Sequence, residues 1–197
     1  LARFSVNERT DLYPDDIALA RAYASALTAE LEEIVNEGCD YVQFDEPVWT
    51  ENVNETLWAA EILNEIIEKF PNVDFNLHVC GGNAHRKRGF FGKYTDMIEA
   101  FKILKVNEIH LEHCSLHYTM LDVFKNWNFD GRISLGVIDQ RIDNTETEED
   151  IVNAIKPALE HFPKEKILLT SECGFGHVPI DIVRNKIKIL VSTAKKI

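Results

Sequence analysis

The sequence has little positive charge and no long apolar run. Its 21 Lys and Arg residues stand against 33 Asp and Glu residues, which gives a formal net charge of −12. That balance argues against nucleic-acid and anionic-membrane binding, because both depend on a basic surface. No apolar run approaches the roughly 18 residues of a membrane-spanning helix, and the first residues do not resemble a signal peptide. We therefore expect a protein that contacts neither nucleic acid nor a membrane.

Cysteine is also scarce, with four residues in a chain of 197. Without a secretory signal, this number favours a cytoplasmic location, where thiols serve metal binding or catalysis more often than disulfides. The nucleotide-binding patterns GxGxxG and the P-loop are both missing. What remains is an ordinary globular composition, 45% hydrophobic and 27% charged, in a chain long enough for one domain.

Short apolar strands alternate with amphipathic helices along the whole chain. Helices are predicted over 15–37, 54–70, 94–105, 119–126, from the acidic run 145–150 onward, and over 179–194. Strands are predicted over 40–44, 75–79, 108–111, 132–138 and 166–170. Gly38 is expected to cap the first helix at its C-terminus, and Asn54 the second at its N-terminus. Five strands alternating with helices indicate a parallel α/β protein.

Every predicted strand ends in a residue that can carry chemistry. Carboxylate, imidazole or thiol groups stand at these ends in Asp45, Glu46, His78, Cys80, Glu112, Cys114, Asp139, Glu172 and Cys173. In a (β/α)8 barrel the carboxyl ends of the strands meet at one mouth, where active sites lie. An open sheet would instead gather its site at one switch point. The pattern therefore favours a TIM barrel.

Two of these ends suggest a metal site. His78 and Cys80 are two residues apart, so on a regular strand both side chains point the same way and could bind one metal. Glu112 and Cys173 end later strands and could complete the ligand set. Thiolate and imidazole suit Zn²⁺. A His-x-Cys pair is not by itself a zinc motif, so unrelated core thiols and a capped histidine are the alternative.

The other two cysteines are weaker ligand candidates. Cys39 precedes a strand and is expected to be a small buried apolar residue. Cys114 lies two residues beyond Glu112, and we expect it to pack behind the barrel mouth.

Five segments occur here in the order found in cobalamin-independent methionine synthases. They are residues 41–47 (YVQFDEP), 78–83 (HVCGGN), 109–112 (IHLE), 136–139 (GVID) and 170–174 (TSECG). Nearly the whole chain resembles the C-terminal, zinc-binding catalytic barrel of that family. The GGN after Cys80 looks more like the shorter single-barrel relatives. The resemblance implies that His78, Cys80, Glu112 and Cys173 bind zinc, and that Asp45 contacts the amino group of the substrate.

The implied activity is methyl transfer to a thiol. A thiolate is a better nucleophile than a thiol, and metal coordination deprotonates a thiol. The resemblance thus implies a methyltransferase that moves a methyl group from methyltetrahydrofolate or a related donor to a homocysteine-like thiol, in methionine synthesis. Two alternatives stay open. The acceptor could be another thiol such as coenzyme M, or the donor a corrinoid protein. The chain could also be a non-catalytic zinc-binding partial barrel.

The proton donor of the resembling family is not matched. Those enzymes carry a histidine shortly after the Gly-Val-x-Asp strand, whereas no histidine closely follows Asp139 here. We expect Asp139 or another group to act as the proton donor. His117 or His177, near the predicted mouth, could replace the missing histidine. Glu46 is the second catalytic candidate, as an acid/base partner of Asp45, or else it is a scaffold for the following turn.

A basic stretch over 83–93 stands out in the acidic chain. It could attract an anionic substrate tail, although a solvated, mobile loop is the expected interpretation.

The length is short for the predicted fold. A (β/α)8 barrel typically needs about 250 residues, and the five predicted strands correspond by resemblance to the last five. We expect residues 1–197 to be a single, partial TIM-barrel catalytic domain that lacks the first three strands. The open sheet edge would be prone to pairing. An N-terminal segment, a second chain or an oligomer is therefore expected to complete the barrel.

Overall fold

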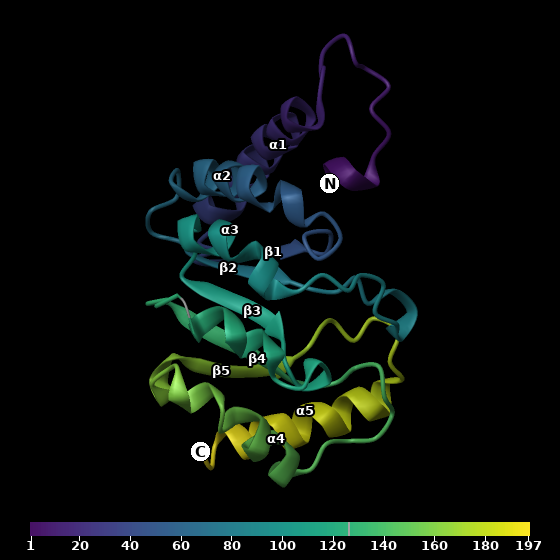
Figure 1. Cartoon of the computed structure of the whole chain (residues 1–197), viewed down its shortest axis with the longest axis vertical. Coiled ribbons are helices and arrows are strands. Elements are labelled where there is room, and N and C mark those ends of the chain that lie inside the picture. The colour runs from purple at the N-terminus through teal and green to yellow at the C-terminus, as the bar shows by residue number, and fades with distance from the viewer. Residues whose placement is uncertain (126) are drawn as a thin grey trace.

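The computed structural model describes residues 1–125 and 127–197 (Figure 1). Its helices are α1 (Asp16–Asn36), α2 (Thr56–Ile67), α3 (Ile98–Ile103), α4 (Glu148–Ile155) and α5 (Ile180–Ala194). Its strands are β1 (Tyr41–Glu46), β2 (Asp74–Val79), β3 (Glu108–Glu112), β4 (Arg132–Ile138) and β5 (Ile167–Ser171). The helix predicted over 119–126 is a 3-10 segment, Thr119–Lys125, and position 126 lies outside the described residues.

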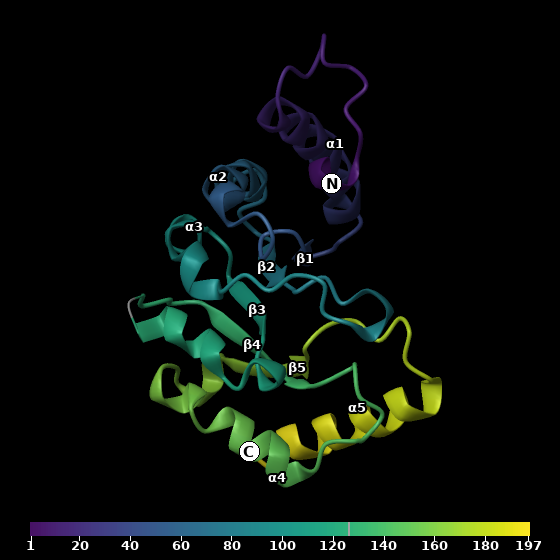
Figure 2. The ribbon, with the colours of Figure 1, turned by 45° about the vertical axis from the view of Figure 1, so that its right-hand side comes forward.

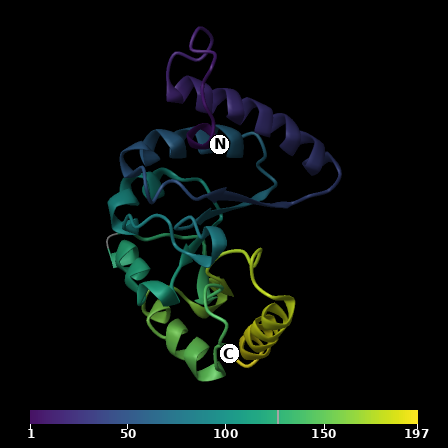
Figure 3. The same ribbon diagram turned by 90° about the vertical axis from the view of Figure 1, so that its right-hand side faces the viewer.

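The five strands form one parallel sheet in which strand order follows chain order, β1-β2-β3-β4-β5. This confirms the predicted parallel α/β fold with five strands. The helices form an outer row around the strands (Figure 2), and the whole is an open crescent with the two termini at opposite ends (Figure 3). Among the described residues, no helix combines the length and the apolar character needed to cross a membrane.

Local signals explain where the helices begin and end. The Asp15 side chain accepts a hydrogen bond from the Ala18 amide at 2.7 Å at the start of α1. Gly38 follows the end of α1 with φ of +100°, a conformation that favours glycine. The prediction that Asn54 caps the second helix is wrong. Asn54 lies inside a 3-10 turn, and α2 begins two residues later without a side-chain cap.

The two faces of the sheet differ in chemistry because side chains alternate along a strand. The helix-facing side is apolar, and Phe75, Leu77 and Ile109 are fully buried there with the helices. On the inner face, neighbouring strands align Gln43, Asn76, Glu108 and Arg132 in one row. Asn76 donates to Gln43 at 2.7 Å, and Arg132 donates to Glu108 at 3.1 Å. The inner face is therefore a hydrogen-bonded polar surface, and the candidate site lies at its carboxyl end.

Candidate metal centre

Three of the predicted ligands meet at the carboxyl end of the sheet. One ligand atom each from His78, Cys80 and Cys173 lies within 4.8 Å of the others. His78 and Cys80 share the inner face, as their two-residue spacing predicts, and Cys173 follows β5. Because β3 and β4 separate β2 from β5, the approach of Cys173 depends on the curvature of the sheet. We call these three residues the donor cluster.

A hydrogen bond orients the His78 ring. Its Nδ1 lies 3.3 Å from the carbonyl oxygen of His110, and since a carbonyl only accepts, Nδ1 carries the proton. In the neutral ring, Nε2 then holds a free lone pair. This atom is buried and has no hydrogen-bond partner among the described residues. In a metal-binding histidine, one ring nitrogen usually donates to a backbone carbonyl or carboxylate while the other binds the metal. His78 has this arrangement, with Nδ1 on the carbonyl and Nε2 free.

The two cysteines of the donor cluster behave as a pair. A hydrogen bond from Cys80 lowers the pKa of Cys173 to about 4. The same hydrogen bond, together with burial, raises the pKa of Cys80. The Gly82 amide also donates to the Cys80 sulfur at 3.3 Å. Two cysteine sulfur atoms and an imidazole nitrogen form a donor set that suits Zn²⁺.

Glu112, the fourth predicted ligand, lies outside the donor cluster. Its side chain is fully buried at the end of β3. One carboxylate oxygen accepts from the Gly81 amide at 2.9 Å and from the Asn83 side chain. The other oxygen pairs with the Arg88 guanidinium. The loop that follows Cys80 thus surrounds this carboxylate with donors.

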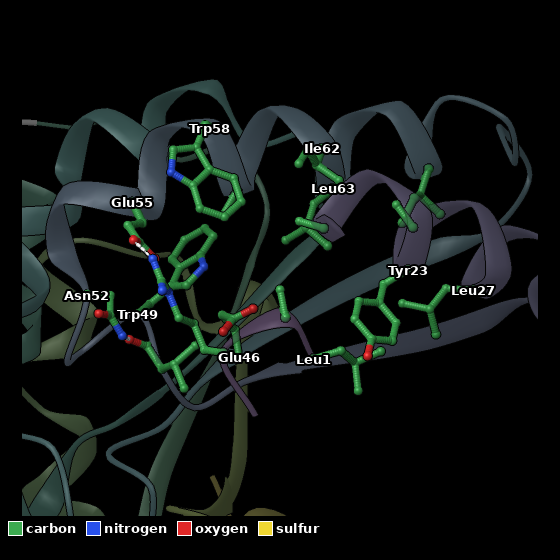
Figure 4. Close-up of a pocket in the computed structure, with 17 residues that line it drawn as sticks. Leu1, Tyr23, Leu27, Glu46, Trp49, Asn52, Glu55, Trp58, Ile62 and Leu63 are labelled. Carbon is green, nitrogen blue, oxygen red and sulfur yellow. Dashed lines mark hydrogen bonds and ion pairs between the residues drawn. The ribbon is translucent and has the colours of Figure 1, made fainter. Parts of the chain in front are cut away.

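Asp45 and Glu46 lie on opposite faces of β1. Asp45 aligns with His78 on the neighbouring strand. Its side chain is exposed and accepts from Gln43 at 2.7 Å. Glu46 points instead into a pocket between α1 and α2, beside Trp49 and Leu63 (Figure 4). Burial raises the pKa of Glu46 to about 7. The structure therefore keeps Glu46 away from the donor cluster, and its catalytic role stays a prediction.

Asp139 belongs to a network that joins the ends of three strands. Its carboxylate accepts from Arg141 Nε at 2.8 Å, and Arg141 also pairs with the buried Glu172. Glu172 accepts the Ser115 amide at 2.7 Å, and burial raises its pKa. Cys114 donates its thiol to the same carboxylate at 3.3 Å. These contacts link the segments that directly follow β3, β4 and β5.

The remaining sequence candidates lie at the rim. His117 is exposed. The His177 ring lies 4.8 Å from the His85 ring, measured between centroids, which brings the loops after β2 and β5 together. Cys39 is half-buried at the amino end of β1 and donates to the Tyr41 carbonyl at 3.3 Å. It is therefore less buried than the sequence predicts.

The expectation of a solvated basic loop is wrong for two of its arginines. Arg86 donates to the carbonyl oxygens of Gln140 and Arg141 at 3.0 and 3.1 Å. Arg88 is buried against Glu112, with 9% of its side chain exposed. The pattern of charges in a sequence is the same whether its arginines are solvated or paired. The pairing of Arg86 and Arg88 could therefore not be predicted. His110 was missed as well, although its position two residues before Glu112 on one strand face could have marked it.

Comparison with known proteins identifies the family. The profile described as "Cobalamin-independent synthase, Catalytic domain" matches residues 9–196. Methionine synthases from Sulfurisphaera tokodaii and Saccharolobus solfataricus are 31% and 28% identical to this chain over 195 residues. Each alignment covers 99% of this chain, but only 53% and 54% of the respective relative. The chain therefore spans about half the length of the curated relatives it matches.

A solved structure supports the same grouping at the level of the fold. A B12-independent methionine synthase from Shewanella sp. W3-18-1, in complex with selenomethionine, superposes with a TM-score of 0.74 at 24% identity. The superposition covers 94% of this chain and 56% of that one. This similarity confirms that the five-strand sheet corresponds to part of a barrel. The chain belongs to the family of cobalamin-independent synthase catalytic domains.

Proposed function

We propose that this chain is the metal-binding part of a zinc-dependent methyltransferase of methionine synthesis. The acceptor is a homocysteine-like thiol, and the donor is methyltetrahydrofolate or a related methyl carrier. The observation that carries the proposal is the donor cluster of His78, Cys80 and Cys173 at the carboxyl end of the sheet. Since the relatives are about twice as long, the activity is proposed for a complete barrel of which residues 1–197 form one partial domain.

The chain's own residues would hold and orient the zinc. His78 would bind through Nε2, because its Nδ1–H is fixed on the His110 carbonyl. Cys80 and Cys173 would bind as thiolates, and Glu112 is the proposed fourth ligand. Zinc held there supplies a Lewis acid that keeps the substrate sulfur in its thiolate form.

Two carboxylates would orient the substrates around this centre. Asp45 is exposed on the inner face, one strand away from His78, and we assign it to the ammonium group of the amino-acid thiol. Asp139 is half-buried at the end of β4 and held by Arg141, and we assign it to the methyl donor as its proton-holding group. Glu46 lies in the pocket between α1 and α2, and we assign it no role at this centre. The four cysteines are free thiols, which suits a reducing compartment such as the cytoplasm.

Metal analysis and X-ray absorption test this proposal. Purified protein should bind about one zinc per chain, as a catalytic zinc site does. Cys80→Ser and Cys173→Ser should lose most of it, whereas Cys39→Ser, at the other end of β1, should keep it. Homocysteine should add a sulfur neighbour to the zinc shell, and coenzyme M tests the other acceptor class. Undiminished zinc in both cluster variants, or a zinc shell that no thiol alters, would contradict the proposal.

A further inference from the structure

A buried ion pair joins α5 to the segment between β4 and α4. Lys186 lies in the middle of α5 and is fully buried. Its Nζ donates to the two carboxylate oxygens of Glu146 at 3.0 and 2.8 Å, and to the Asn144 carbonyl at 2.6 Å. Every N–H donor of the ammonium group is therefore used. Because α5 packs beside α4 and β5 (Figure 1), this pair connects the outer helices to the end of the sheet.

The same pair reaches the candidate site through the backbone of Asp139. Glu146 Oε1 accepts from Lys186 and also from the Asp139 amide, at 2.8 Å. Asp139 is the first residue after β4, and the pairing of β4 with β5 shifts register between Gly136 and Ile138. An irregularity of this kind bends a strand and changes the direction of its side chains. The sheet by itself therefore does not fix the position of Asp139.

Asp139 is held at two points. Arg141 holds the carboxylate, because its backbone amide and its Nε both donate to Oδ1 at 2.8 Å. Glu146 holds the backbone amide. The Asp139 side chain keeps 17% of its surface exposed, so a substrate can still reach the carboxylate.

Stability alone does not explain a buried ion pair at this position. Taking two charges out of water is costly, and well-packed apolar residues of similar volume are often equally stable or more so. Apolar residues cannot, however, supply a fixed acceptor for the Asp139 amide. Such an acceptor matters at a reacting group, since a misplacement of about 1 Å can lower a reaction rate about a hundredfold.

We propose that Lys186 and Glu146 are positioning residues that fix the Asp139 backbone, and with it the carboxylate that meets the methyl donor. Lys186 holds the Glu146 carboxylate, and Glu146 holds the Asp139 amide. This inference rests on the proposed function, in which Asp139 serves the methyl donor. It extends the site to α5, a helix of the outer row.

The test replaces the ion pair with apolar residues of similar size. The apolar double variant, Glu146→Leu with Lys186→Met, should keep the fold because neither charge is left buried alone, but it removes the acceptor of the Asp139 amide. Hydrogen exchange followed by NMR should show this amide exchanging about tenfold faster or more, while the Leu135 amide at the centre of β4 keeps its protection.

Turnover gives the second measurement, in the complete zinc-loaded barrel for which the activity is proposed. With methyltetrahydrofolate and homocysteine, the apolar double variant should lose about tenfold or more in kcat. Its zinc content and its KM for homocysteine should stay unchanged, because the pair lies outside the donor cluster. A general loss of structure would change all of these quantities together.

Two further double variants serve as controls. Glu148→Leu with Lys196→Met removes the same two charges from an exposed pair that also joins the start of α4 to the end of α5. It should keep full turnover and the protection of the Asp139 amide. The amide double variant, Glu146→Gln with Lys186→Met, removes both buried charges but keeps an oxygen that can accept from Asp139. It should retain that protection and most of the turnover, and it tests the inference even where the apolar double variant does not fold.

The outcomes distinguish this inference from the proposed function. If the wild-type barrel transfers no methyl group, both proposals fail. If the wild type is active and the apolar double variant turns over equally fast, or keeps its Asp139 amide protected, the pair is only structural and the inference is refuted while the proposed function stands. The inference is refuted equally if the amide double variant loses tenfold in kcat with its Asp139 amide still protected, because the position of Asp139 would then be intact.

Discussion

Glu46 should make the stability of the fold depend on pH. Its carboxyl group lies in the pocket between α1 and α2, and burial raises its pKa from 4.5 to about 7. An acid with a raised pKa holds its proton more tightly in the folded state than in the unfolded state. Its proton therefore stabilises the fold below about pH 4.5, and this contribution is lost as the pH rises toward 7. Complete loss of this contribution lowers the free energy of unfolding by about 3 kcal/mol.

The substitution Glu46→Gln measures this effect, because the amide has nearly the same shape and carries no charge. Urea unfolding should show the variant to be more stable than the wild type by about 1 kcal/mol at pH 5.5 and by about 3 kcal/mol at pH 8. Glu51→Gln is the control, since it makes the same change at an exposed position five residues later. It should shift stability equally at both pH values.

The pH dependence is the decisive part of this prediction. If Glu46→Gln were more stable than the wild type by the same amount at both pH values, the difference would come from packing of the amide and not from desolvation of the carboxylate. No gain at pH 8 would mean that water reaches the Glu46 carboxylate freely and that its pKa is not raised. Either result would refute the reasoning from burial.

Three other variants probe separate parts of the molecule. Lys186 is fully buried, with Nζ 2.8 Å from Glu146. Lys186→Met should lower the free energy of unfolding by about 3–5 kcal/mol in urea titrations, and Glu146→Gln should recover part of this loss. Thr147→Ala removes the capping box of α4 and should cost about 1 kcal/mol in thermal unfolding. Cys114→Ser should keep its zinc in metal analysis, because this thiol bonds to a buried carboxylate outside the donor cluster; a loss as large as that of Cys80→Ser would rule out this placement.

Most of the fold was predictable because its signals are local. Strand β4 is apolar and bounded by polar residues, and it spans Arg132–Ile138 as predicted. Strand β1 runs to Glu46, two residues beyond the predicted end. Hydropathy cannot identify Asp45 and Glu46 as strand residues, but their pairing with His78 and Val79 on β2 keeps them extended. Where pairing with a partner strand keeps residues extended, the sequence of one strand alone does not predict where that strand ends.

The candidate site was predictable only where spacing decides the geometry. Alternation along a strand places His78 and Cys80 on one face, and the same rule could have separated Asp45 from Glu46. By contrast, the orientation of Arg88 depends on Glu112, which is 24 positions later. Nothing near Arg88 in the sequence distinguishes a paired arginine from a solvated one. Side chains whose partners come from another strand were therefore the ones that the sequence analysis missed.

The strand order has a consequence for how the chain assembles. Each strand pairs with the one before it, so each pairing closes a segment of roughly 25 to 35 residues at a similar loss of chain entropy. The sheet can therefore grow strand by strand as the chain becomes available. The donor cluster cannot form that way, because Cys173 joins His78 and Cys80 only after β5 has docked. The proposed metal site is thus completed only when β5 has docked, and a chain arrested before β5 would offer only the His-x-Cys half of the cluster.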